Sequence, residues 1–597
     1  MKSLVTILLA VLFLSTNLVY GAVRRVPSQY PTVQAAINAC LNGDTVLVAE
    51  GHYYENISFM GKAIIVASNF LIDADTTHIS HTIIDGSLPP DPYSASVVSF
   101  NSGEDTTSVL CGFTITGGTG SAIGWRAGGG VLCSSRAKII HNIIRDNSLT
   151  DTTGGVVAGG GIYCSGQYYV IEDNRIGSNH LVGEASAWGG GIVLNGCSGR
   201  IMGNTITENA SQSRMGDALG GGVFCLTSPG LYVDVLISNN TIANNVLDIS
   251  EPTTLLCGGG GVWAATAPQE ITNPSLALRL TRNDISGNIV RSPSTCSGGG
   301  VLVAAVAESS VIDANTIIAN RAYASLTRGG GLSLSYWLPA VTNNIIADNE
   351  AYYGAGLRIY DSSVRGRRIS VINNTIVNNV GGSNIYSQRT DGVVMNTIVW
   401  SDSSYQEISV SEGLLRIVYS DVKYNWPDSG NTDLPPRFLD NTYRLSHYSQ
   451  CIGAGTGSFQ VGGVWYFAPA RCIYGGTRPN PQGSRPDIGA CEDSLAIPVG
   501  VEETSNLENP TTFALHQNYP NPFNPSTTIR FQLPTQAHVT LKVFDLLGRE
   551  VAMLVNELKQ PAAYSVQWNA GGMASGVYFY QLQSGSWVDV KKLILLR

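Results

Sequence analysis

Two parts of this 597-residue sequence carry side chains whose types and spacing could do chemistry. The first is the stretch DADTTHISHTIIDG, which brings together imidazole and carboxylate groups that could hold a metal ion: His78, His81, Asp73, Asp75 and Asp85. Two histidines separated by two residues outside a helix are a weak metal signature, so we favour the interpretation that this stretch is an ordinary strand and turn. We therefore predict no metal site and no cofactor, and leave calcium binding open.

The second part is a set of segments, each running from an asparagine to the next glycine triplet, whose length varies from four residues, 350–353, to thirteen, 246–258. We expect these variable segments to be loops, which commonly line one edge of a regular scaffold and form binding surfaces. Aromatic rings with charges between them suit a glycan, because a ring can cover the apolar face of a sugar. The sequence therefore predicts a ligand-binding strip made of Trp188, Arg214, Asp217, Tyr323, Arg328, Tyr352 and Tyr353. An irregular, solvated edge without a ligand is the alternative.

Catalysis is the other chemistry to consider, and the sequence assigns no catalytic residues. An enzyme that cleaves an acidic polysaccharide needs two or three carboxylates that converge from neighbouring repeats. The acidic residues instead lie mostly in asparagine-rich turns, where Asp can bind turn backbone groups as Asn does. We therefore favour a non-enzymatic protein. The alternative is a polysaccharide lyase or glycoside hydrolase whose carboxylates meet only in the folded chain.

Repeats must position all of these residues. Glycine triplets recur along the chain, beginning at Gly128, Gly159, Gly189, Gly220, Gly259, Gly298 and Gly329, with a variant at Gly354-Ala355-Gly356. The motif Asn-x-Ile-x-x-Asn stands between many of them, short alternating apolar segments follow each triplet, and helix-length amphipathic patterns are absent there. Repeats of this kind, built from short strands and turns, predict a solenoid. We expect an all-β fold, a right-handed parallel β-helix over residues 71–493.

Stacked coils would explain why glycine and asparagine recur. Successive coils of a β-helix lie about 4.8 Å apart, so equivalent residues form ladders. Glycine allows positive φ and close backbone approach where one coil turns against the next, and asparagine can stack on its equivalent and satisfy turn backbone groups. We predict a structural asparagine ladder formed by Asn142, Asn174, Asn204, Asn240, Asn283, Asn315, Asn344 and Asn374.

The eleven cysteines follow the same register. Cys133, Cys164 and Cys225 follow their triplets at one fixed position, so we expect them in the core as small hydrophobic residues. Cys257 and Cys296 each stand two residues before a triplet, one coil apart, and are the better candidates for a disulfide.

The N-terminal end and the close of the array carry recognisable motifs. Residues 1–21 have the basic start, apolar stretch and small-residue end of a signal peptide, and no other segment looks able to span a membrane. Residues 22–70 offer a helix cap at Thr32, an Asn-Gly stop and a first strand, and they resemble the N-terminal cap of pectin-lyase-like β-helix proteins. The repeats resemble those of bacterial surface adhesins. RPDIGACE, Arg485 to Glu492, resembles the closing motif of surface β-helix proteins.

The composition changes after a polar linker at 494–512. Residues 513–597 contain the proline-bounded alternating strands of a small Ig-like β-sandwich. Segments from Asn518 to Pro525 and from Gly576 to Lys592, with LGRE between them, resemble the type A C-terminal sorting domain of the type IX secretion system. This resemblance implies that the secretion machinery is a partner and that the protein is secreted or reaches the outer-membrane surface.

The net charge of the chain excludes one class of partner. A net charge of −9 offers no basic face for nucleic acid. We therefore expect a secreted or cell-surface β-helix protein that binds a polysaccharide or a cell-surface glycan, or acts as an adhesin, with no transmembrane segment in the mature chain.

Overall fold

The computed structural model describes residues 21–251, 257–267, 274–361, 368–402, 406–424, 426–499, 512–518 and 521–596. Nearly all of the expected signal peptide and most of the expected linker lie outside these ranges. The chain divides into two compact units, Met1–Val499 and Gly500–Arg597. The first unit extends past the expected boundary at Asp493, because Leu495 packs against its core and the Val499 amide donates to the carbonyl of His447.

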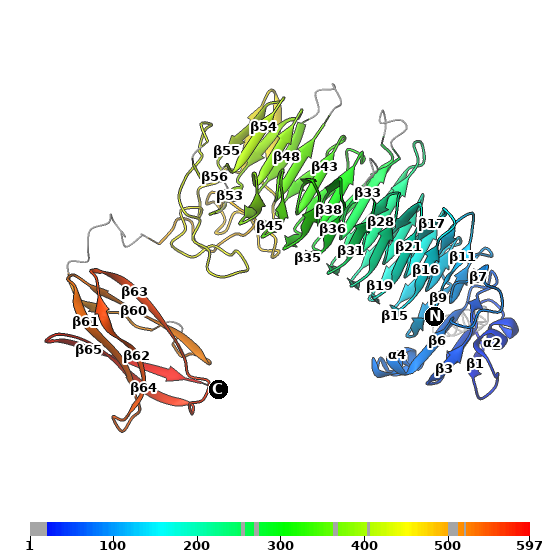
Figure 1. Cartoon of the computed structure of the whole chain (residues 1–597), viewed down its shortest axis with the longest axis horizontal. Helices are drawn as coiled ribbons and strands as arrows, with labels where there is room; N and C mark the ends of the chain where they lie inside the picture. Colours follow the sequence, from blue (N-terminus) through cyan, green and yellow to red (C-terminus); the bar gives the residue numbers. More distant parts are fainter. Residues whose placement is uncertain are drawn as a thin grey trace, which may run out of the picture. The chain divides into compact units, whose positions relative to one another are not determined.

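Three parallel sheets form the body of the first unit (Figure 1). Sheet A has fourteen strands, from β1 (Val23–Val26) to β55 (Leu415–Val418), and sheet B has thirteen, from β3 (Gly51–Tyr54) to β56 (Asp421–Val422). Sheet C has twelve: β4 (Ile57–Ser58), β8 (Val98–Phe100), β13 (Val131–Cys133), β18 (Ile162–Ser165), β23 (Ile192–Asn195), β28 (Val223–Thr227), β33 (Val262–Thr266), β38 (Val301–Ala304), β43 (Leu332–Ser335), β47 (Leu357–Tyr360), β51 (Ile385–Gln388) and β54 (Ile408–Ser411). Neighbouring strands come from successive coils and enclose one apolar core. The predicted all-β, parallel β-helix is confirmed.

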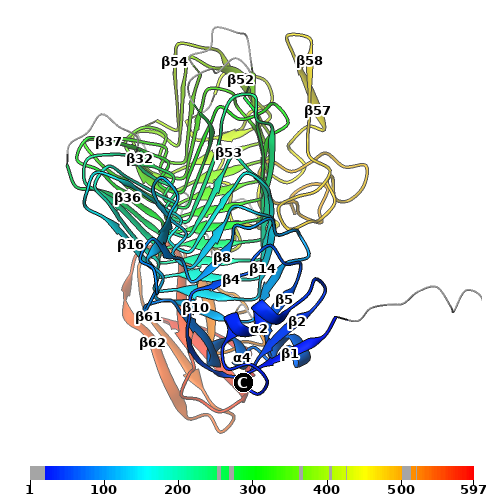
Figure 2. The same ribbon diagram turned by 90° about the vertical axis from the view of Figure 1, so that its right-hand side faces the viewer.

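Two further sheets form a lobe beside this body, where the sequence predicted loops (Figure 2). Sheet E has eight parallel strands, from β16 (Ser148–Asp151) to β50 (Val380–Gly381). Sheet D has nine, mostly parallel: β7 (Ser94–Ala95), β11 (Gly120–Ala122), β12 (Arg126–Ala127), β17 (Val156–Ala158), β22 (Ser186–Trp188), β27 (Ala218–Leu219), β32 (Cys257–Gly258), β37 (Thr295–Ser297) and β42 (Leu326–Arg328). The expectation of loops was wrong because alternate residues such as Leu149, Val157 and Leu181 are buried and stack on their equivalents, which favours strands.

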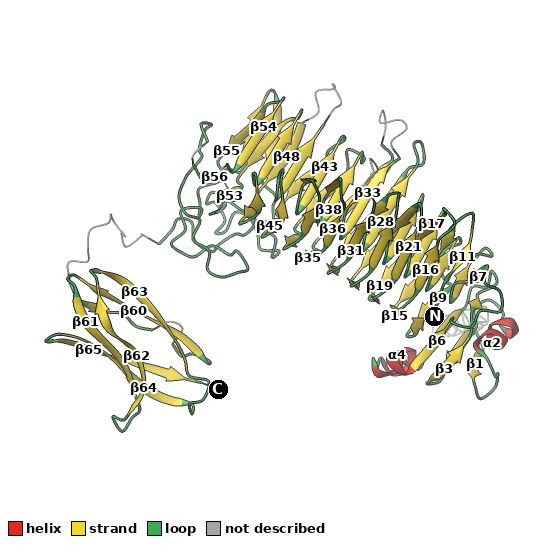
Figure 3. Cartoon of the chain, viewed as in Figure 1, coloured by secondary structure: helices red, strands yellow, loops and turns green. Residues whose placement is uncertain are grey.

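Helices in the described residues lie at the N-terminal end of the solenoid (Figure 3). They are α2 (Val33–Ala39), α3 (Phe70–Asp73) and α4 (Thr77–His81). The Thr32 hydroxyl accepts the amide N–H of Ala35 at 3.1 Å, which starts α2. Its buried face then covers the first coil, as an N-terminal cap requires.

The glycine triplets lie where sheet D gives way to sheet C, and one triplet shows why glycine is needed. Gly259 has a φ of 69°, and a Cβ there would lie 2.7 Å from the Cβ of Trp263. A Cβ on Gly260 would lie 2.3 Å from the carbonyl oxygen of Gly299 in the next coil. The chain therefore turns a corner at these positions that a larger residue would obstruct.

The eight asparagines of the predicted ladder lie in the turns between sheets A and B. Asn240 is typical, because its Nδ2 donates to Oδ1 of Asn283 at 2.9 Å and to the carbonyl of Ile201 at 2.8 Å. Equivalent amide-to-amide bonds join Asn142, Asn174, Asn204, Asn240, Asn283, Asn315, Asn344 and Asn374. A second ladder, between sheets B and E, joins Asn147, Asn179, Asn209, Asn245, Asn288, Asn320, Asn349 and Asn379. All of these asparagines are buried, so they satisfy turn backbone groups that water cannot reach.

All eleven cysteines are buried free thiols, which corrects the disulfide prediction for Cys257 and Cys296. The two residues are neighbours, since Gly258 pairs with Ser297 in parallel register. Side chains at equivalent positions of parallel strands point the same way, so their Cβ atoms also lie about 4.8 Å apart, which is beyond the roughly 3.5–4.5 Å of a disulfide. Burial raises the pKa of both thiols, that of Cys296 to about 12. The pair packs in the core of the lobe instead.

A closing segment, residues 426–499, packs against the flank of the solenoid. Its Tyr443 joins an apolar cluster on the outer face of sheet B. Its hairpin of β57 (Ser458–Val461) and β58 (Val464–Phe467) places Tyr466 against the outer face of sheet A. The last coils of the solenoid are therefore covered along two sides.

The second unit contains two antiparallel sheets. One consists of β59 (Ala514–Leu515), β60 (Ser526–Leu533) and β63 (Ala562–Asn569), and the other of β61 (Ala537–Phe544), β62 (Glu550–Lys559), β64 (Gly576–Ser584) and β65 (Trp587–Leu595). Ile529, Leu541 and Tyr580 are fully buried in its core. Across the described part of both units, no helix is long and apolar enough to cross a membrane.

Candidate ligand-binding corner

Sheets D and C meet at the glycine triplets and form a corner, whose outward side chains are here called the corner face. On sheet C it consists of the residues four positions after the first triplet glycine or its equivalent: Leu132, Tyr163, Val193, Phe224, Trp263, Leu302, Ser333, Arg358 and Tyr386. On sheet D it consists of the residues directly before the triplets: Ala127, Ala158, Trp188, Leu219, Gly258, Ser297, Arg328 and Tyr353. Each row stacks coil on coil in parallel register.

The N-terminal half of the corner face, up to the coil of Trp263, is closed by aromatic packing. The ring of Phe224 stacks on that of Trp188 from sheet D at 5.6 Å and on that of Trp263 at 4.7 Å between centroids. Tyr163, Phe224 and Trp263 are at most 5% exposed. Trp188, a residue of the predicted strip, thus lies at the partly exposed edge of a second apolar core.

Three indole groups in this half have a buried Nε1–H with no acceptor among the described residues: Trp125, Trp188 and Trp263. Trp125 packs edge-on against Tyr163 and Trp188. A buried donor without an acceptor destabilises a fold by roughly 1–3 kcal/mol. The hydroxyl groups of a ligand could accept these N–H groups, so the N-terminal half is the alternative to the C-terminal half as a ligand-binding location.

The C-terminal half of the corner face, from the coil of Leu302 onward, has mostly polar side chains at the same positions, and several of them are partly exposed. Arg358 and Tyr386 continue the row on sheet C, and Arg328 and Tyr353 continue the row on sheet D. The rings of Tyr353 and Tyr386 lie 4.9 Å apart between centroids. Tyr352 beside them is 62% exposed. Three residues of the predicted strip, Arg328, Tyr352 and Tyr353, therefore lie together here.

Arg358 was not among the sequence candidates. It lies in β47 between Leu357 and Ile359, which are fully buried in the core, so its side chain points to the outside of sheet C. Its Nη1 donates to Oγ of Ser335 at 2.9 Å, and its guanidinium carbon lies 5.0 Å from the ring centroid of Tyr360. Arg358 is only 7% exposed, and this burial lowers the pKa of its guanidinium to about 10.

The other residues of the predicted strip do not reach the corner face. Arg214 forms an exposed ion pair with Glu184 in the turn between sheets E and D. Asp217 lies in the same turn, where its carbonyl accepts the amide N–H of Ala187 at 2.9 Å. Tyr323 ends β41 (Arg321–Tyr323) of sheet E and is 40% exposed. The predicted strip is therefore divided between separate parts of the lobe.

The histidine-rich stretch forms local contacts and includes a short helix, where the sequence predicted a strand and turn. The ring of His78 in α4 lies between Glu50 and Asp73, with N to O distances of 2.8 and 3.2 Å. Hydrogen bonds to Asp73 and Glu50 raise the pKa of His78. His81 contacts the carbonyl oxygen of Thr77 instead. In the part of the chain that the structure describes, no group of three or more His, Cys, Asp or Glu side chains is placed to hold a metal ion.

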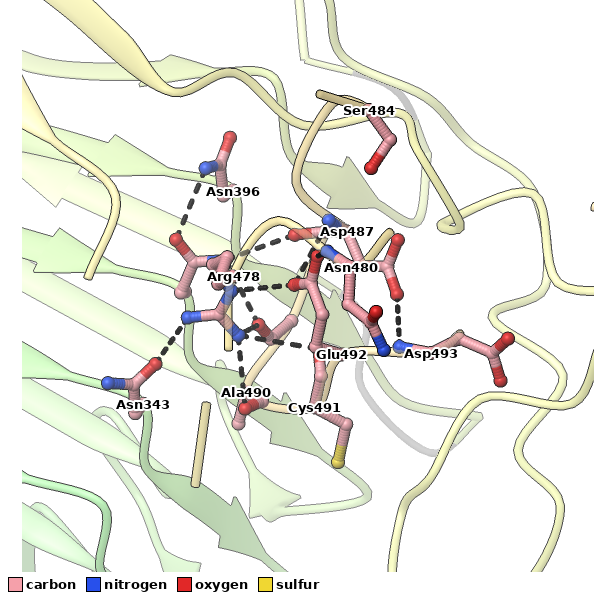
Figure 4. Close-up of polar contacts among 12 residues, drawn as sticks. Asn343, Asn396, Arg478, Asn480, Ser484, Asp487, Ala490, Cys491, Glu492 and Asp493 are labelled. Carbon is pink, nitrogen blue, oxygen red and sulfur yellow. Dashed lines mark hydrogen bonds and ion pairs between the residues drawn. The ribbon is translucent and has the colours of Figure 1, made fainter. Parts of the chain in front are cut away.

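A buried ion pair within the closing segment also contacts the solenoid (Figure 4). Arg478 Nε donates to Glu492 Oε2 at 2.7 Å, and neither side chain is more than 1% exposed. The same guanidinium donates to Oδ1 of Asn343 in the solenoid, and to three carbonyl oxygens of the closing segment, those of Gly489, Ala490 and Cys491. The donors of Arg478 are thus used within the chain, so we assign this cluster a structural role.

Asp487, the aspartate of the RPDIGACE motif, is the remaining acidic residue of this cluster. Its carboxylate accepts the amide N–H groups of Gly453 at 2.7 Å and Asp493 at 2.6 Å. Burial, with the negative charge of Glu492 nearby, raises the pKa of Asp487 to about 7. The motif therefore supplies one carboxylate for the arginine and one for the backbone of the closing segment.

Comparison with known families agrees with both units of the structure. A model of the right handed beta helix region matches residues 71–273 and 270–398, which together are more than half of the chain. A model of the secretion system C-terminal sorting domain matches residues 517–596. No curated protein and no solved structure matches the chain. The chain therefore belongs to the right-handed β-helix family and is a secreted or cell-surface protein whose C-terminal unit is a type IX secretion system sorting domain.

Proposed function

We propose that the protein binds a glycan, and that the C-terminal half of the corner face is the binding site. The observation that carries this proposal is the group of Tyr352, Tyr353 and Tyr386 beside Arg328 and Arg358 on one outward surface. Partly exposed aromatic rings can cover the apolar faces of sugars, and guanidinium groups can donate to their oxygens. The coils of the solenoid repeat the same backbone on either side of this group of residues. The surface is therefore extended along the solenoid axis, which suits a long polysaccharide chain.

Acidic residues are scarce at this corner, which speaks against catalysis there. The strands of sheets C and D, as the structure describes them, contain no Asp or Glu. Glycoside hydrolysis needs a pair of carboxyl groups on either side of the scissile bond, and proton abstraction needs a base within hydrogen-bond reach. A non-enzymatic role, with adhesion to a glycan-bearing surface as its outcome, therefore fits the corner better than a lyase or hydrolase.

The test is equilibrium binding of the purified chain to a polysaccharide panel, with product formation followed in the same samples, with and without calcium. We expect binding without turnover, and a roughly tenfold or greater loss of affinity when Tyr353→Ala and Tyr386→Ala are combined. Tyr323→Ala is the matched control, because Tyr323 is exposed on sheet E, away from the corner.

Equal losses from the control and from the double variant would place the ligand elsewhere and contradict the proposed site. Release of reducing ends or unsaturated products would instead support the lyase or hydrolase alternative. Failure to bind any member of the panel would contradict glycan binding itself.

A further inference from the structure

We propose that Arg328 and Arg358 form an anion-binding subsite that receives a carboxylate or sulfate group of an acidic glycan. This inference rests on the proposed glycan-binding function and names the class of glycan. It is carried by a buried guanidinium that has no counter-charge on the protein.

Arg358 is the only charged residue in the twelve described strands of sheet C. It lies in register between Ser333 on one side and Tyr386 on the other. Its contacts with protein oxygens are with hydroxyl groups, at 2.9 Å to Ser335 and 3.4 Å to Ser333. Its Nε is buried and has no hydrogen-bond partner among the described residues. The Nε–H of Arg358 is therefore a donor that the described chain leaves unsatisfied.

Other arginines of the solenoid show that this lack of a partner is unusual. Arg478 is fully buried and pairs with Glu492, and Arg416 pairs with Asp428 at 2.9 Å. Arg126 lies in sheet D, nearest the N-terminal half of the corner, and donates to three backbone carbonyls. No ion pair joins Arg358 to a carboxylate in the described ranges, and the sequence of the segment that follows Asp361, 362–367, contains no acidic residue. A buried charge without a partner is costly for a fold, and an incoming anion would offset that cost.

Arg328 supplies the second positive charge. It directly precedes its glycine triplet in sheet D and pairs with Tyr353 of the next coil, and its positive charge lowers the pKa of Arg358 further, after burial. The Arg328 carbonyl accepts the amide N–H of Gly298, whereas its guanidinium has no hydrogen bond or ion pair among the described residues. Two guanidinium groups of this kind attract a divalent or bidentate oxyanion, because each can donate two parallel N–H bonds to it.

The surrounding tyrosines fit the sugar ring that would carry the anion. Tyr360 lies against the guanidinium of Arg358, and Tyr336 packs edge-on against Tyr360 with centroids 5.8 Å apart. Tyr353 lies in the same coil as Arg358, and Tyr386 follows in the next coil. An anionic group held by the arginines would thus bring its sugar ring next to aromatic rings.

The experiment compares ligand pairs that differ only in charge, using isothermal titration of the full chain. Dextran against dextran sulfate tests sulfate, and methyl-esterified polygalacturonate against polygalacturonate tests carboxylate. Inorganic sulfate, added as a competitor, separates a free anion from one carried on a glycan. We expect at least one charged polymer to bind roughly ten- to hundredfold more tightly than its neutral partner, as a charge-assisted hydrogen bond implies.

The variants assign this preference to the two arginines. Arg358→Met should abolish the preference for the charged polymer, Arg328→Gln should reduce it, and Arg358→Lys should keep part of it because the charge remains without the planar fork. Arg279→Gln is the control, since Arg279 pairs with Asp234 at 3.0 Å on an exposed part of sheet A and should leave the preference unchanged. Circular dichroism of each variant checks that the β-helix has formed, and Arg328→Gln serves if Arg358→Met does not fold.

Three results would contradict the proposed anion subsite. Equal affinity for charged and neutral polymers would overturn the anion subsite and leave the proposed glycan binding intact. A preference that survives both Arg358→Met and Arg328→Gln would place the anion elsewhere and overturn the assignment. Binding of inorganic sulfate alone, with no polymer bound, would contradict the proposed function and with it this inference.

Discussion

The two halves of the corner face share one backbone and differ in what stands at equivalent positions. Phe224 and Trp263 in the N-terminal half, and Ser333 and Arg358 in the C-terminal half, all follow the first triplet glycine by four residues. In the first half the aromatic rings pack against one another. In the second half a guanidinium is left without a carboxylate. A solenoid can therefore replace an apolar cluster with a polar surface by substitution at one ladder position, because the stacked backbone does not change.

The largest expected effect tests whether the N-terminal half is a core. Trp263→Ala should lower the free energy of unfolding by about 3–5 kcal/mol, because it removes a buried ring and leaves a cavity. Chemical denaturation followed by fluorescence measures this. Tyr352→Ala, at a side chain that is 62% exposed, should change it by less than about 0.5 kcal/mol. Similar values for the two variants would mean that the aromatic half contributes no core.

The pH dependence of stability should differ between the two ends of the solenoid. The pKa of Asp487 is about 7 in the folded chain, above its unfolded value near 4, so the folded state holds the proton more tightly. Stability is therefore highest at low pH and falls as pH rises through 7, by roughly 2–3 kcal/mol between pH 5 and pH 8. Burial raises the pKa of Glu492 in the same direction.

Hydrogen exchange at the two pH values, corrected for the intrinsic exchange rate, locates this effect. We expect weaker protection at pH 8 in the closing segment, and little change in the coils around Asn174 and Asn204, whose buried amides do not titrate. Asp487→Asn should remove most of the pH dependence of the closing segment. A uniform change along the solenoid, or one that Asp487→Asn leaves intact, would contradict the assignment.

The asparagine ladder should behave alike in both halves, because the backbone it supports is the same. Asn240→Ala and Asn344→Ala each leave buried backbone groups without a partner, so each should cost about 2 kcal/mol of unfolding free energy. Denaturation measures both, with the exposed Asn441→Ala as the control. A large difference between the two ladder variants would mean that the halves differ in backbone support and not only in side chains.

The smallest expected effect concerns Arg358. Replacing a buried charge that has no counter-ion with an apolar side chain of similar length is often neutral or stabilising. Arg358→Met should therefore change the unfolding free energy by no more than about 1 kcal/mol, in contrast to Trp263→Ala. A loss of 3 kcal/mol or more would show that Arg358 holds the fold together, and would remove the argument that it is kept for a ligand.

The periodicity of the sequence predicts most of the fold. The alternation of apolar and polar residues within the variable segments is the signal that predicts the two further sheets. The triplets and Asn-x-Ile-x-x-Asn motifs predicted the parallel coils, since each marks a turn that recurs in register. The variable length of these segments predicts loops, although Leu149, Leu181 and Leu247 recur at matched positions and are buried in the lobe.

The site was only partly predictable for a related reason. Trp188, Arg328 and Tyr353 directly precede a triplet, and the structure places them on the corner face, while Arg214 and Tyr323 share only the same segments. Arg358 could have been found from its fixed distance to Gly354, the position that Tyr163 and Trp263 occupy in other coils. The absence of a counter-ion for Arg358 could not be predicted, because it depends on which side chains the folded chain brings close to the guanidinium.

Hydrogen exchange of the full chain with and without a bound acidic oligosaccharide tests the central claim most directly. The account predicts new protection confined to 326–336, 353–360 and 385–388, the strands that carry Arg328, Arg358 and Tyr386. Protection centred on 125–132 and 186–193, around Trp125 and Trp188, would contradict it and place the ligand in the aromatic half.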